Sequence, residues 1–409
     1  MREGQRGLCY VRGVQNGEVV LTSWGNASGF CVDPIEKKPL NHFLPGTPVL
    51  SLGQFGCNLT CQFCQNWSIS KAQRDNPTQH GISLLDAEID AEKTHVLKKD
   101  TEKNTRFETS ESQTHAQHTF HKHAKEPQNS ATFSTCKSCQ NWDISKSREL
   151  DRLQAKASPE MIADAAVKTG CKSVAVTYND PVIFLEYAVD VAEACHARDI
   201  KMVAVTAGYI TPEPRAEFYR HMDAANVDLK GFTEGFYKDL CTGSLAPVLE
   251  TLKYLKHETD VWFEITNLMI PGENDSDAEI EEMTAWVMDN LGPDVPMHFS
   301  AFHPDWKMTD KLNTPLETVV RARKIAMKNG IRYAYTGNVH DTEGDATTCH
   351  DCGELLIGRD WYELGHWNVK VGGNYTGNCG HCGAALPGVF DGPPGNWGRK
   401  QLPVNLSDL

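Results

Sequence analysis

The stretch that decides the fold is SVAVTYNDPVIFLEYAVDVAEACHARDIKMVAVT, residues 173–206. Two short runs rich in valine and alanine flank a longer segment with helical periodicity, which predicts a strand, a helix and a second strand. The alternation continues along the chain, with strand-like runs at 48–52, 224–229, 261–266, 296–300 and 332–336 and helix-like segments at 277–290 and 316–329. About seven such β–α units predict an α/β fold with a parallel sheet, forming a full or partial barrel with active residues at the carboxyl ends of its strands.

Composition and charge exclude several classes of protein. The chain has 409 residues, 40% of them hydrophobic, and a formal net charge of −14, which opposes general binding to nucleic acid. The sequence contains no run of 18 apolar residues, so we expect no membrane-spanning helix. The first residues, MREGQR, lack the apolar core of a secretory signal. We therefore expect a cytoplasmic or organelle-matrix protein, with neither nucleic acid nor membrane among its partners.

Changes in composition divide the chain into four parts. Residues 1–45 form an amino-terminal extension, and residues 46–340 form the barrel, which a polar insertion at about 73–134 interrupts. Low hydrophobicity and the lack of periodicity predict that this insertion is disordered, so we interpret its His115, His118, His121 and His123 as solvated side chains. Residues 341–390 are expected to form a small metal-binding ribbon, and residues 391–409 a tail.

Three cysteines follow the first predicted strand of the barrel. Cys57, Cys61 and Cys64 have the spacing Cys-x3-Cys-x2-Cys on one short loop. Three thiolates can hold three irons of a [4Fe–4S] cluster and leave the fourth iron without a protein ligand. Half of a zinc site is the alternative, but a structural zinc site closes with four ligands. The triplet therefore predicts a cluster with one open iron, at the edge of the sheet where active residues are expected.

The motifs around this loop resemble those of radical S-adenosylmethionine (SAM) enzymes. The similarity is strongest to the AmmeMemoRadiSam-system radical SAM enzymes, which are related to pyruvate formate-lyase activating enzyme. It is carried by DPIEKKPL at 33–40, PG at 45–46, GCNL at 56–59, CQNW at 64–67, TYNDP at 177–181, NVDLKG at 226–231, IPGEND at 270–275, HFS at 298–300, HPD at 303–305 and GNV at 337–339. The resemblance implies that SAM binds the open iron through its amino and carboxylate groups, and that one-electron cleavage yields a radical that abstracts hydrogen from a substrate.

The resemblance also implies a set of SAM contacts. Phe63 would lie near the adenine, and Asp180 would contact the SAM amino group. The full set of candidate cofactor-binding residues is Phe63, Tyr178, Asn179, Asp180, Thr206, Asp228, Lys230, His298 and Ser300. Asp180 stands where such enzymes commonly have Glu, and Ala207 where they commonly have Asn, so these two contacts are altered. Residues 7–12 match only the end of the Cys/His-rich segment of such relatives, which predicts a truncated start.

A second, incomplete copy of the cysteine loop follows 75 residues later. TCQFCQNWSISK at 60–71 recurs as TCKSCQNWDISK at 135–146, with Cys136 and Cys139 in place of Cys61 and Cys64. The second copy has Thr132 where the first has Cys57, so it cannot supply three ligands by itself. We assign the cluster to the first copy. Because closing a loop of this length costs only a few kcal/mol, the alternative of Cys57 with Cys136 and Cys139 remains open.

The carboxy-terminal region contains two Cys-x2-Cys-Gly motifs. Cys349 and Cys352 form the first, and Cys379 and Cys382 the second. Four thiolates in two such turns predict a structural zinc site, with an auxiliary iron–sulfur cluster or a rubredoxin-like iron as the alternatives. We expect the ribbon to have a structural or substrate-docking role.

Two functions remain open at this point. The first is a radical SAM oxidoreductase, supplied with electrons by a flavodoxin or a ferredoxin, which acts on a protein glycyl position or on a small molecule. The second is a non-catalytic iron–sulfur scaffold that has lost turnover. Formation of 5′-deoxyadenosine would distinguish them.

Overall fold

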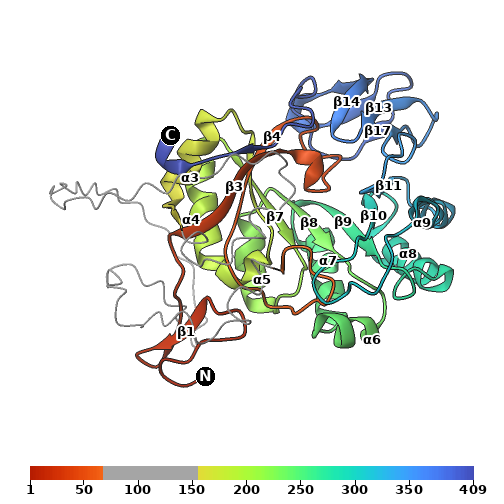
Figure 1. Cartoon of the computed structure of the whole chain (residues 1–409). Coiled ribbons are helices and arrows are strands. Elements are labelled where there is room, and N and C mark those ends of the chain that lie inside the picture. The colour runs from red at the N-terminus through yellow and green to blue at the C-terminus, as the bar shows by residue number, and fades with distance from the viewer. Residues whose placement is uncertain (68–154) are drawn as a thin grey trace, which may run out of the picture.

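The computed structural model describes residues 1–67 and 155–409. The expected insertion, its four histidines, and Cys136 and Cys139 lie outside the described residues. Within the described part, the predicted α/β architecture is confirmed (Figure 1).

A mixed sheet forms the centre of the molecule. Seven of its described strands are parallel, and each pairs with the next one along the chain: β4 (Pro48–Gly53), β6 (Ser173–Val176), β7 (Lys201–Thr206), β8 (Ala224–Asp228), β9 (Trp262–Met269), β10 (Met297–Ala301) and β11 (Ala334–Gly337). These strands coincide with the predicted runs to within one to three residues. Because consecutive parallel strands need crossovers on one side, helices cover one face of the sheet.

The crossover helices begin and end where local sequence requires it. They are α3 (Pro159–Lys168), α4 (Leu185–His196) after the short η3 (Pro181–Phe184), α5 (Pro212–Arg220), α6 (Glu234–Phe236) with the π-helical η4 (Tyr237–Cys241), α7 (Ala246–Glu258), α8 (Asp277–Leu291) and α9 (Leu316–Lys328). The Ser158 side chain accepts a hydrogen bond from the Met161 N–H and caps α3. Ser276 caps α8 in the same way, through the Glu279 N–H. The helices predicted at 277–290 and 316–329 are confirmed.

Strands outside the β–α units extend the sheet beyond β4. β3 (Asn26–Pro34) pairs antiparallel with β4, and β18 (Leu402–Pro403) pairs antiparallel with β3. The short β5 (Ala155–Lys156) also pairs with β3, while β1 (Arg12–Gln15) and β2 (Glu18–Leu21) form a separate hairpin. Residues of the expected extension and of the expected tail therefore both contribute strands to the central sheet. Within the described residues, β11 and β18 are the two edge strands of this sheet, and they do not pair with each other.

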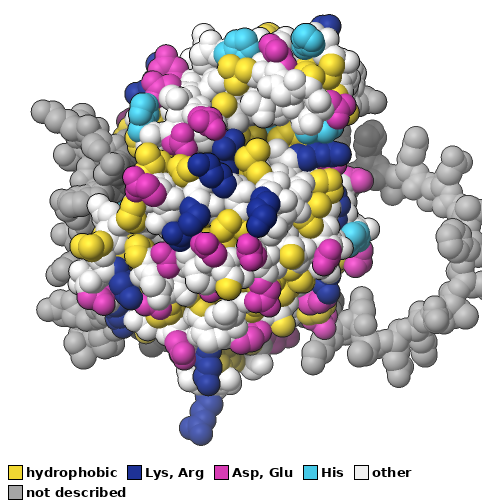
Figure 2. Space-filling model, turned by 90° about the vertical axis from the view of Figure 1, so that its right-hand side faces the viewer, with side chains coloured by type: hydrophobic (Ala, Val, Ile, Leu, Met, Phe, Trp, Pro, Cys, Tyr) yellow, Lys and Arg dark blue, Asp and Glu magenta, His cyan; other side chains and the backbone are white. Residues whose placement is uncertain are grey.

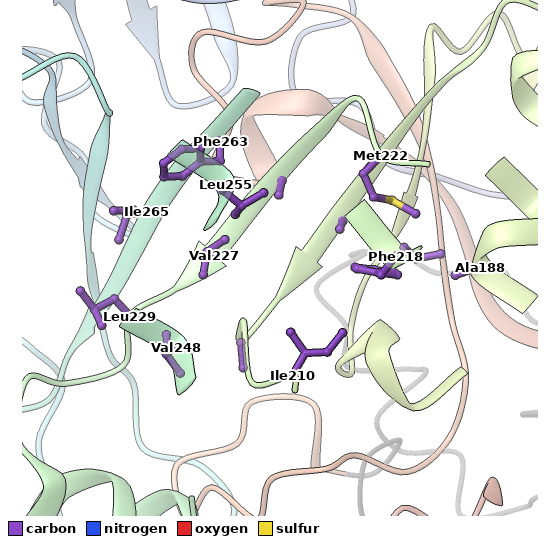
Figure 3. Close-up of a cluster of buried hydrophobic side chains, with 14 of the residues drawn as sticks. Ala188, Ile210, Phe218, Met222, Val227, Leu229, Val248, Leu255, Phe263 and Ile265 are labelled. Atoms are coloured by element: carbon purple, nitrogen blue, oxygen red, sulfur yellow. The ribbon is translucent and has the colours of Figure 1, made fainter. Parts of the chain in front are cut away.

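The two faces of the parallel strands bury different side chains. The outer face packs on the helices, with Val227 and Ile265 of the sheet in one cluster with Val248 and Leu255 of α7, and with Phe218 of α5 beside Met222 and Ala188 (Figure 3). The inner face packs on residues 35–44, which include the 3-10 helix η1 (Ile35–Lys37). In this inner cluster, Ile35, Leu40, Phe43 and Leu44 pack with Val49, Ala175, Val203 and Ala224. Residues 35–44 therefore fill the inner face of the sheet.

The carboxy-terminal residues form a ribbon of two small antiparallel sheets. The first contains β12 (Thr347–Thr348), β13 (Leu355–Asp360) and β14 (Glu363–Trp367), and the second contains β15 (Val369–Val371), β16 (Gly377–Cys379) and β17 (Ala385–Leu386). Two 3-10 turns, η5 (Gly373–Tyr375) and η6 (Leu406–Asp408), complete the described elements. The ribbon lies at the top right of Figure 1, whereas the β1 hairpin lies at the bottom left.

The side of the molecule that carries α8, α9 and the ribbon has a mixed surface. Figure 2 shows lysine and arginine side chains interspersed with aspartate and glutamate over this face. Several of these charges form ion pairs, such as Arg321 with Asp277 at 2.9 Å and Arg332 with Asp294 at 2.8 Å. Exposed pairs of this kind contribute little to stability. Among the helices of the described residues, none is long and apolar enough to cross a membrane.

A buried polar network joins residues 41–42, the barrel and the ribbon. Its centre is Glu264 of β9, whose carboxylate accepts hydrogen bonds from the backbone N–H groups of Asn41 (3.0 Å) and His42 (2.7 Å) and contacts His298 Nε2 at 2.7 Å. The His42 ring contacts the Tyr335 hydroxyl through Nε2 and the Pro387 carbonyl through Nδ1, each at 2.6 Å. The ribbon is thus fixed to the barrel through groups that have no access to water.

Arg359 of β13 extends this network into the ribbon. Its guanidinium donates hydrogen bonds to the Asn41 carbonyl at 2.8 Å and to the Thr347 hydroxyl at 2.9 Å. Thr347 lies two residues before Cys349 and also contacts the Tyr335 hydroxyl at 2.8 Å. Because Arg359 is 4% exposed, its charge depends on these partners for compensation.

The Glu264→Gln substitution tests the network through its pH dependence. Burial would raise the pKa of Glu264, but the hydrogen bond and charge of His298, with His42 and the Asn41 N–H, lower it below 4.5. The carboxylate therefore contributes stability above the pKa of the unfolded chain, and this contribution is lost as pH falls through the folded pKa. We expect Glu264→Gln to lower the free energy of unfolding by about 3–5 kcal/mol at pH 7 and by less in acid.

Denaturant titrations at pH 7 and below pH 4 measure this difference. Glu250→Gln is the matched control, since Glu250 forms only an exposed pair with Lys253 on α7. An effect of Glu264→Gln that is the same at both pH values would contradict the assignment of a charged Glu264 at the centre of the network.

Candidate cofactor site

The three predicted cluster cysteines lie on the loop that follows β4. Cys61 is buried, whereas Cys57 and Cys64 are partly exposed. The loop leaves the sheet at the carboxyl end of β4, beside the carboxyl end of β6. Approach of the two strand ends requires glycine at position 53, because a Cβ there would lie 2.5 Å from the Thr177 carbonyl oxygen. The cysteines therefore lie at the edge of the sheet that the sequence predicted.

Asn179 fixes the start of the cysteine loop to the end of β6. Its side-chain Nδ2 donates a hydrogen bond to the Gly56 carbonyl at 2.9 Å, and its Oδ1 accepts one from the Gln54 N–H at 3.1 Å. Asn58 continues the attachment by donating to the Tyr209 carbonyl at 3.0 Å. Asn179 thus positions the backbone directly before Cys57, which is a structural role that the sequence did not predict.

The middle of the loop pairs with η4. The Thr60 N–H donates a hydrogen bond to the Cys241 carbonyl, and the Gln62 N–H donates one to the Leu240 carbonyl, both at 2.9 Å. These bonds lie on either side of Cys61. They hold its backbone against the segment that follows β8.

The end of the loop contacts the segment that follows β10. Trp67 donates a hydrogen bond through Nε1 to Asp305 at 2.9 Å and stacks on Trp306, with ring centroids 4.8 Å apart. The Lys307 N–H donates to the Gln62 carbonyl at 3.1 Å. Segments after β6, β7, β8 and β10 therefore all hold the loop, although these strands are distant in sequence.

Asp180 and Thr206 form a buried pair between the ends of β6 and β7. Asp180 Oδ1 accepts hydrogen bonds from the Thr206 hydroxyl at 2.9 Å and the Val182 N–H at 3.2 Å, and Oδ2 accepts one from the Ala207 N–H at 3.3 Å. Burial raises the pKa of this carboxyl group, and the three donors oppose that change. The structure brings together two residues predicted as SAM contacts, and it directs both carboxylate oxygens of Asp180 to protein donors.

Tyr178 precedes this pair in an unusual backbone conformation. Its φ is 70°, in the left-handed region that non-glycine residues seldom adopt, directly at the carboxyl end of β6. The ammonium group of the buried Lys38 lies 5.3 Å from the centre of its ring. The ring therefore lies close to a positive charge from the segment that fills the inner face.

Asp228 and Lys230 form an ion pair at the end of β8. Lys230 Nζ lies 2.7 Å from Asp228 Oδ2, and the Lys230 N–H donates to the Tyr237 hydroxyl at 3.1 Å. Burial alone would lower the pKa of Lys230, but Asp228 and the thiols of Cys61 and Cys241 raise it well above its usual value. The Asp228 carboxylate, unlike that of Asp180, is partly exposed.

The remaining predicted contacts occupy different places. Phe63 is buried against Phe236 of α6, with ring centroids 5.7 Å apart. His298 is the second residue of β10 and binds Glu264 in the ribbon-linked network, not a group at the carboxyl end of its strand. Ser300 lies against Gly337 of β11. A Cβ atom on residue 337 would come within 2.5 Å of the Ser300 hydroxyl oxygen. His298 thus lies near the amino end of β10, whereas Ser300 lies one residue before its carboxyl end.

The four carboxy-terminal cysteines converge on one point of the ribbon. Their sulfurs all lie within 4.8 Å of one another, with Cys349 and Cys382 3.6 Å apart and Cys352 and Cys379 3.7 Å apart. Four sulfurs at about 2.3 Å from one ion in a tetrahedron would be roughly 3.8 Å apart, so the donor set fits a single Zn²⁺ or Fe ion. Gly353 and Gly383, which follow the second cysteine of each motif, have φ values of 75° and 82°. Both glycines therefore adopt the left-handed conformation that such a turn requires.

Sequence reasoning missed two residues near the cysteine loop. Cys241, which belongs to none of the predicted cysteine motifs, is buried beside Cys61. Gly56 packs so closely on the amino-terminal segment that a Cβ would lie within 1.9 Å of the Cys9 carbonyl oxygen. No periodicity or spacing indicates either contact, because both join segments that only the tertiary fold brings together.

The fold and the site together define an α/β protein with a three-cysteine loop at the carboxyl edge of a parallel sheet. The family model described as the radical SAM superfamily matches residues 132–284, a range that includes Cys136 and Cys139 but not Cys57 to Cys64. The chain is also 33% identical over 386 residues to the uncharacterised protein MJ0808 of Methanocaldococcus jannaschii, covering 94% of this chain and 91% of that protein. The chain belongs to the radical SAM superfamily, and this membership implies a [4Fe–4S] cluster and SAM.

Solved structures with similar folds include three from bacteria. One is a domain of a pyruvate-formate lyase-activating enzyme from Bacteroides vulgatus (17% identity, 41% of this chain and 99% of that chain, TM-score 0.36). A second is a radical SAM methyltransferase from Sphaerobacter thermophilus (17% identity, 47% and 58%, TM-score 0.37). The third is SuiB of Streptococcus suis bound to SAM (14% identity, 46% and 45%, TM-score 0.38).

Proposed function

We propose that this chain is a radical SAM oxidoreductase that holds a [4Fe–4S] cluster on Cys57, Cys61 and Cys64. The observation that carries the proposal is the fixation of the cysteine loop by hydrogen bonds to segments after β6, β7 and β8 and by contacts after β10. Such fixation keeps three thiols at one edge of the sheet, as a cluster with one open iron requires. When bound, the cluster and SAM would supply the electron and the hydrogen-abstracting radical.

The chain's own residues would position SAM and exclude water. The Asp228–Lys230 pair at the end of β8 offers both a carboxylate and an ammonium group, and the ammonium lies within electrostatic range of Cys61. Asp180 and Thr206 would act through the backbone, because their mutual hydrogen bond fixes the ends of β6 and β7. The Phe63–Phe236 contact would close the apolar side of the loop.

We further propose that electrons come from a flavodoxin or a ferredoxin. The substrate class supported by the resemblance to activating enzymes is a glycyl position of a partner protein, with a small molecule as the alternative. The four-cysteine ribbon would bind zinc and keep the amino ends of β9 to β11 in place through Tyr335 and Glu264.

Reductive cleavage of SAM tests the proposal directly. We expect the anaerobically reconstituted chain to form 5′-deoxyadenosine when dithionite and SAM are supplied, measured by chromatography with mass detection. Asp228→Asn should lower this rate by about tenfold to a hundredfold, because one charged contact contributes about 1.5–3 kcal/mol. The exposed Asp260→Asn is the control. A fully loaded cluster that forms no 5′-deoxyadenosine would favour the non-catalytic scaffold.

A further inference from the structure

Cys241 places a fourth thiol beside the cysteine loop. It is the last residue of η4 and has no exposed surface, and Cys61 is 8% exposed. The thiol of Cys241 interacts with the thiol of Cys61, and Cys57 lies within electrostatic range of the same sulfur. Cys241 takes part in none of the contacts assigned above to SAM or to the ribbon.

Backbone pairing holds Cys61 and Cys241 in register. The Thr60 N–H donates to the carbonyl of Cys241 itself, and the Gln62 N–H donates to the carbonyl of Leu240. The two cysteines are therefore on directly hydrogen-bonded segments, and their side chains interact with each other. A disulfide needs Cα atoms about 4.4–6.8 Å apart and converging Cβ vectors, and interacting thiols on hydrogen-bonded backbone segments favour both conditions.

We infer that Cys61 and Cys241 form a reversible disulfide when the cluster is absent, and that this bond protects a cluster ligand from irreversible oxidation. The inference rests on the proposed function, because it takes Cys61 as a ligand of the cluster. In a chain without its cluster, the Cys61 thiol is otherwise open to sulfinic and sulfonic acid formation, which cannot be reversed by thiols. The buried Cys241 thiol would react with the sulfenic acid of Cys61 before that acid is oxidised further.

Hydrogen peroxide is the oxidant in this reaction. The Cys61 sulfur attacks one peroxide oxygen, the O–O bond breaks, and hydroxide leaves and is protonated to water, giving the sulfenic acid. The Cys241 sulfur then attacks the Cys61 sulfur, the S–O bond breaks, and a second water leaves. Two thiols lose two electrons and one peroxide gains them. A dithiol such as dithiothreitol reverses the change by thiol–disulfide exchange.

Peptide mapping of the full-length, cluster-free chain tests the bond. The reduced chain is treated with one equivalent of peroxide, its remaining thiols are alkylated, and digestion products are identified by mass. We expect a cross-linked pair containing Cys61 and Cys241. A cross-link from Cys61 to Cys57, Cys64, Cys136 or Cys139, or recovery of Cys241 as the alkylated thiol, would overturn the inference. This measurement needs no variant and no cluster.

Recovery of iron binding tests the protection. Wild type, Cys241→Ala and the control Cys195→Ala, which removes a buried thiol from α4, are treated with excess peroxide, reduced with dithiothreitol and then reconstituted. We expect wild type and the control to regain their iron, and Cys241→Ala to regain about tenfold less because Cys61 is over-oxidised. Cys241→Ser serves if the alanine variant does not fold. Equal recovery in all chains would overturn the inference, whereas failure of untreated wild type to bind iron would contradict the proposed function.

Discussion

Replacing Cys61 and Cys64 together by alanine is expected to abolish the cluster. A single remaining thiolate, Cys57, cannot hold three irons, so the iron content of the reconstituted chain should fall from about four atoms to near zero. Formation of 5′-deoxyadenosine should fall with it. The expected loss is complete because the first copy of the loop carries the contacts to η4 and to the segment after β10.

The matched control is Cys136→Ala with Cys139→Ala in the second copy, which should retain the cluster. The control is informative because the two copies share most of TCxxCQNWxISK, and because the family model matches the range that contains the second copy. Iron and sulfide analysis with the absorbance spectrum measures both pairs. Full cluster content in the Cys61/Cys64 variant, with loss in the Cys136/Cys139 variant, would assign Cys136 and Cys139 as partners of Cys57.

Replacing Cys352 by alanine is expected to release the ribbon's metal ion. Three sulfurs would remain of a set that lies within 4.8 Å, and a structural zinc site needs four ligands. Apparent binding free energies of such sites reach about 10–16 kcal/mol in zinc-finger peptides, and this energy holds the fold together. The ribbon should therefore unfold locally, and the Arg359 and Pro387 contacts to residues 41–42 should be lost with it.

Metal analysis and thermal unfolding measure this second effect. We expect about one zinc per chain in wild type and almost none in the variant, and we expect the unfolding midpoint of the barrel to fall as well. Cys171→Ala is the control, since that buried cysteine lies outside both metal sites. About one iron and no zinc in the wild-type chain before its cluster is reconstituted would instead identify iron in the ribbon, and an unchanged midpoint would contradict the coupling between ribbon and barrel.

The sequence predicted the β–α units well because their signals are local. Runs such as SVAVT at 173–177 and MVAVT at 202–206 are buried on both faces, and a β-rich apolar run between turn residues has few alternatives. The helix α3 likewise has local signals in the sequence, the Ser158 cap and the proline at its first position. Cysteine spacing likewise indicated the convergence in the ribbon, because each turn holds two ligands and its glycine.

Contacts between distant segments were not predictable in this way. β3 and β18 extend the sheet, but their pairing depends on strands more than 350 residues apart in the chain, β18 lying near the carboxyl terminus. His298 was expected to contact the cofactor, and its partner Glu264 is hidden in an otherwise ordinary strand run. Cys241 carries no motif at all. Each of these outcomes is determined by the position of one segment against another, which local periodicity does not encode.

The location of residues 41–46 limits how this protein can be divided. The Leu44 N–H donates to the Val389 carbonyl, the Val389 N–H donates to the His42 carbonyl, and the Trp397 N–H donates to the Gly46 carbonyl. A chain shortened to end at residue 340 would therefore expose the edge of a segment that the barrel needs on its inner face. We therefore expect ribbon and barrel to be inherited and expressed as one unit. A gene that encoded the barrel alone would need other residues to replace Pro387 and Val389, the partners of His42.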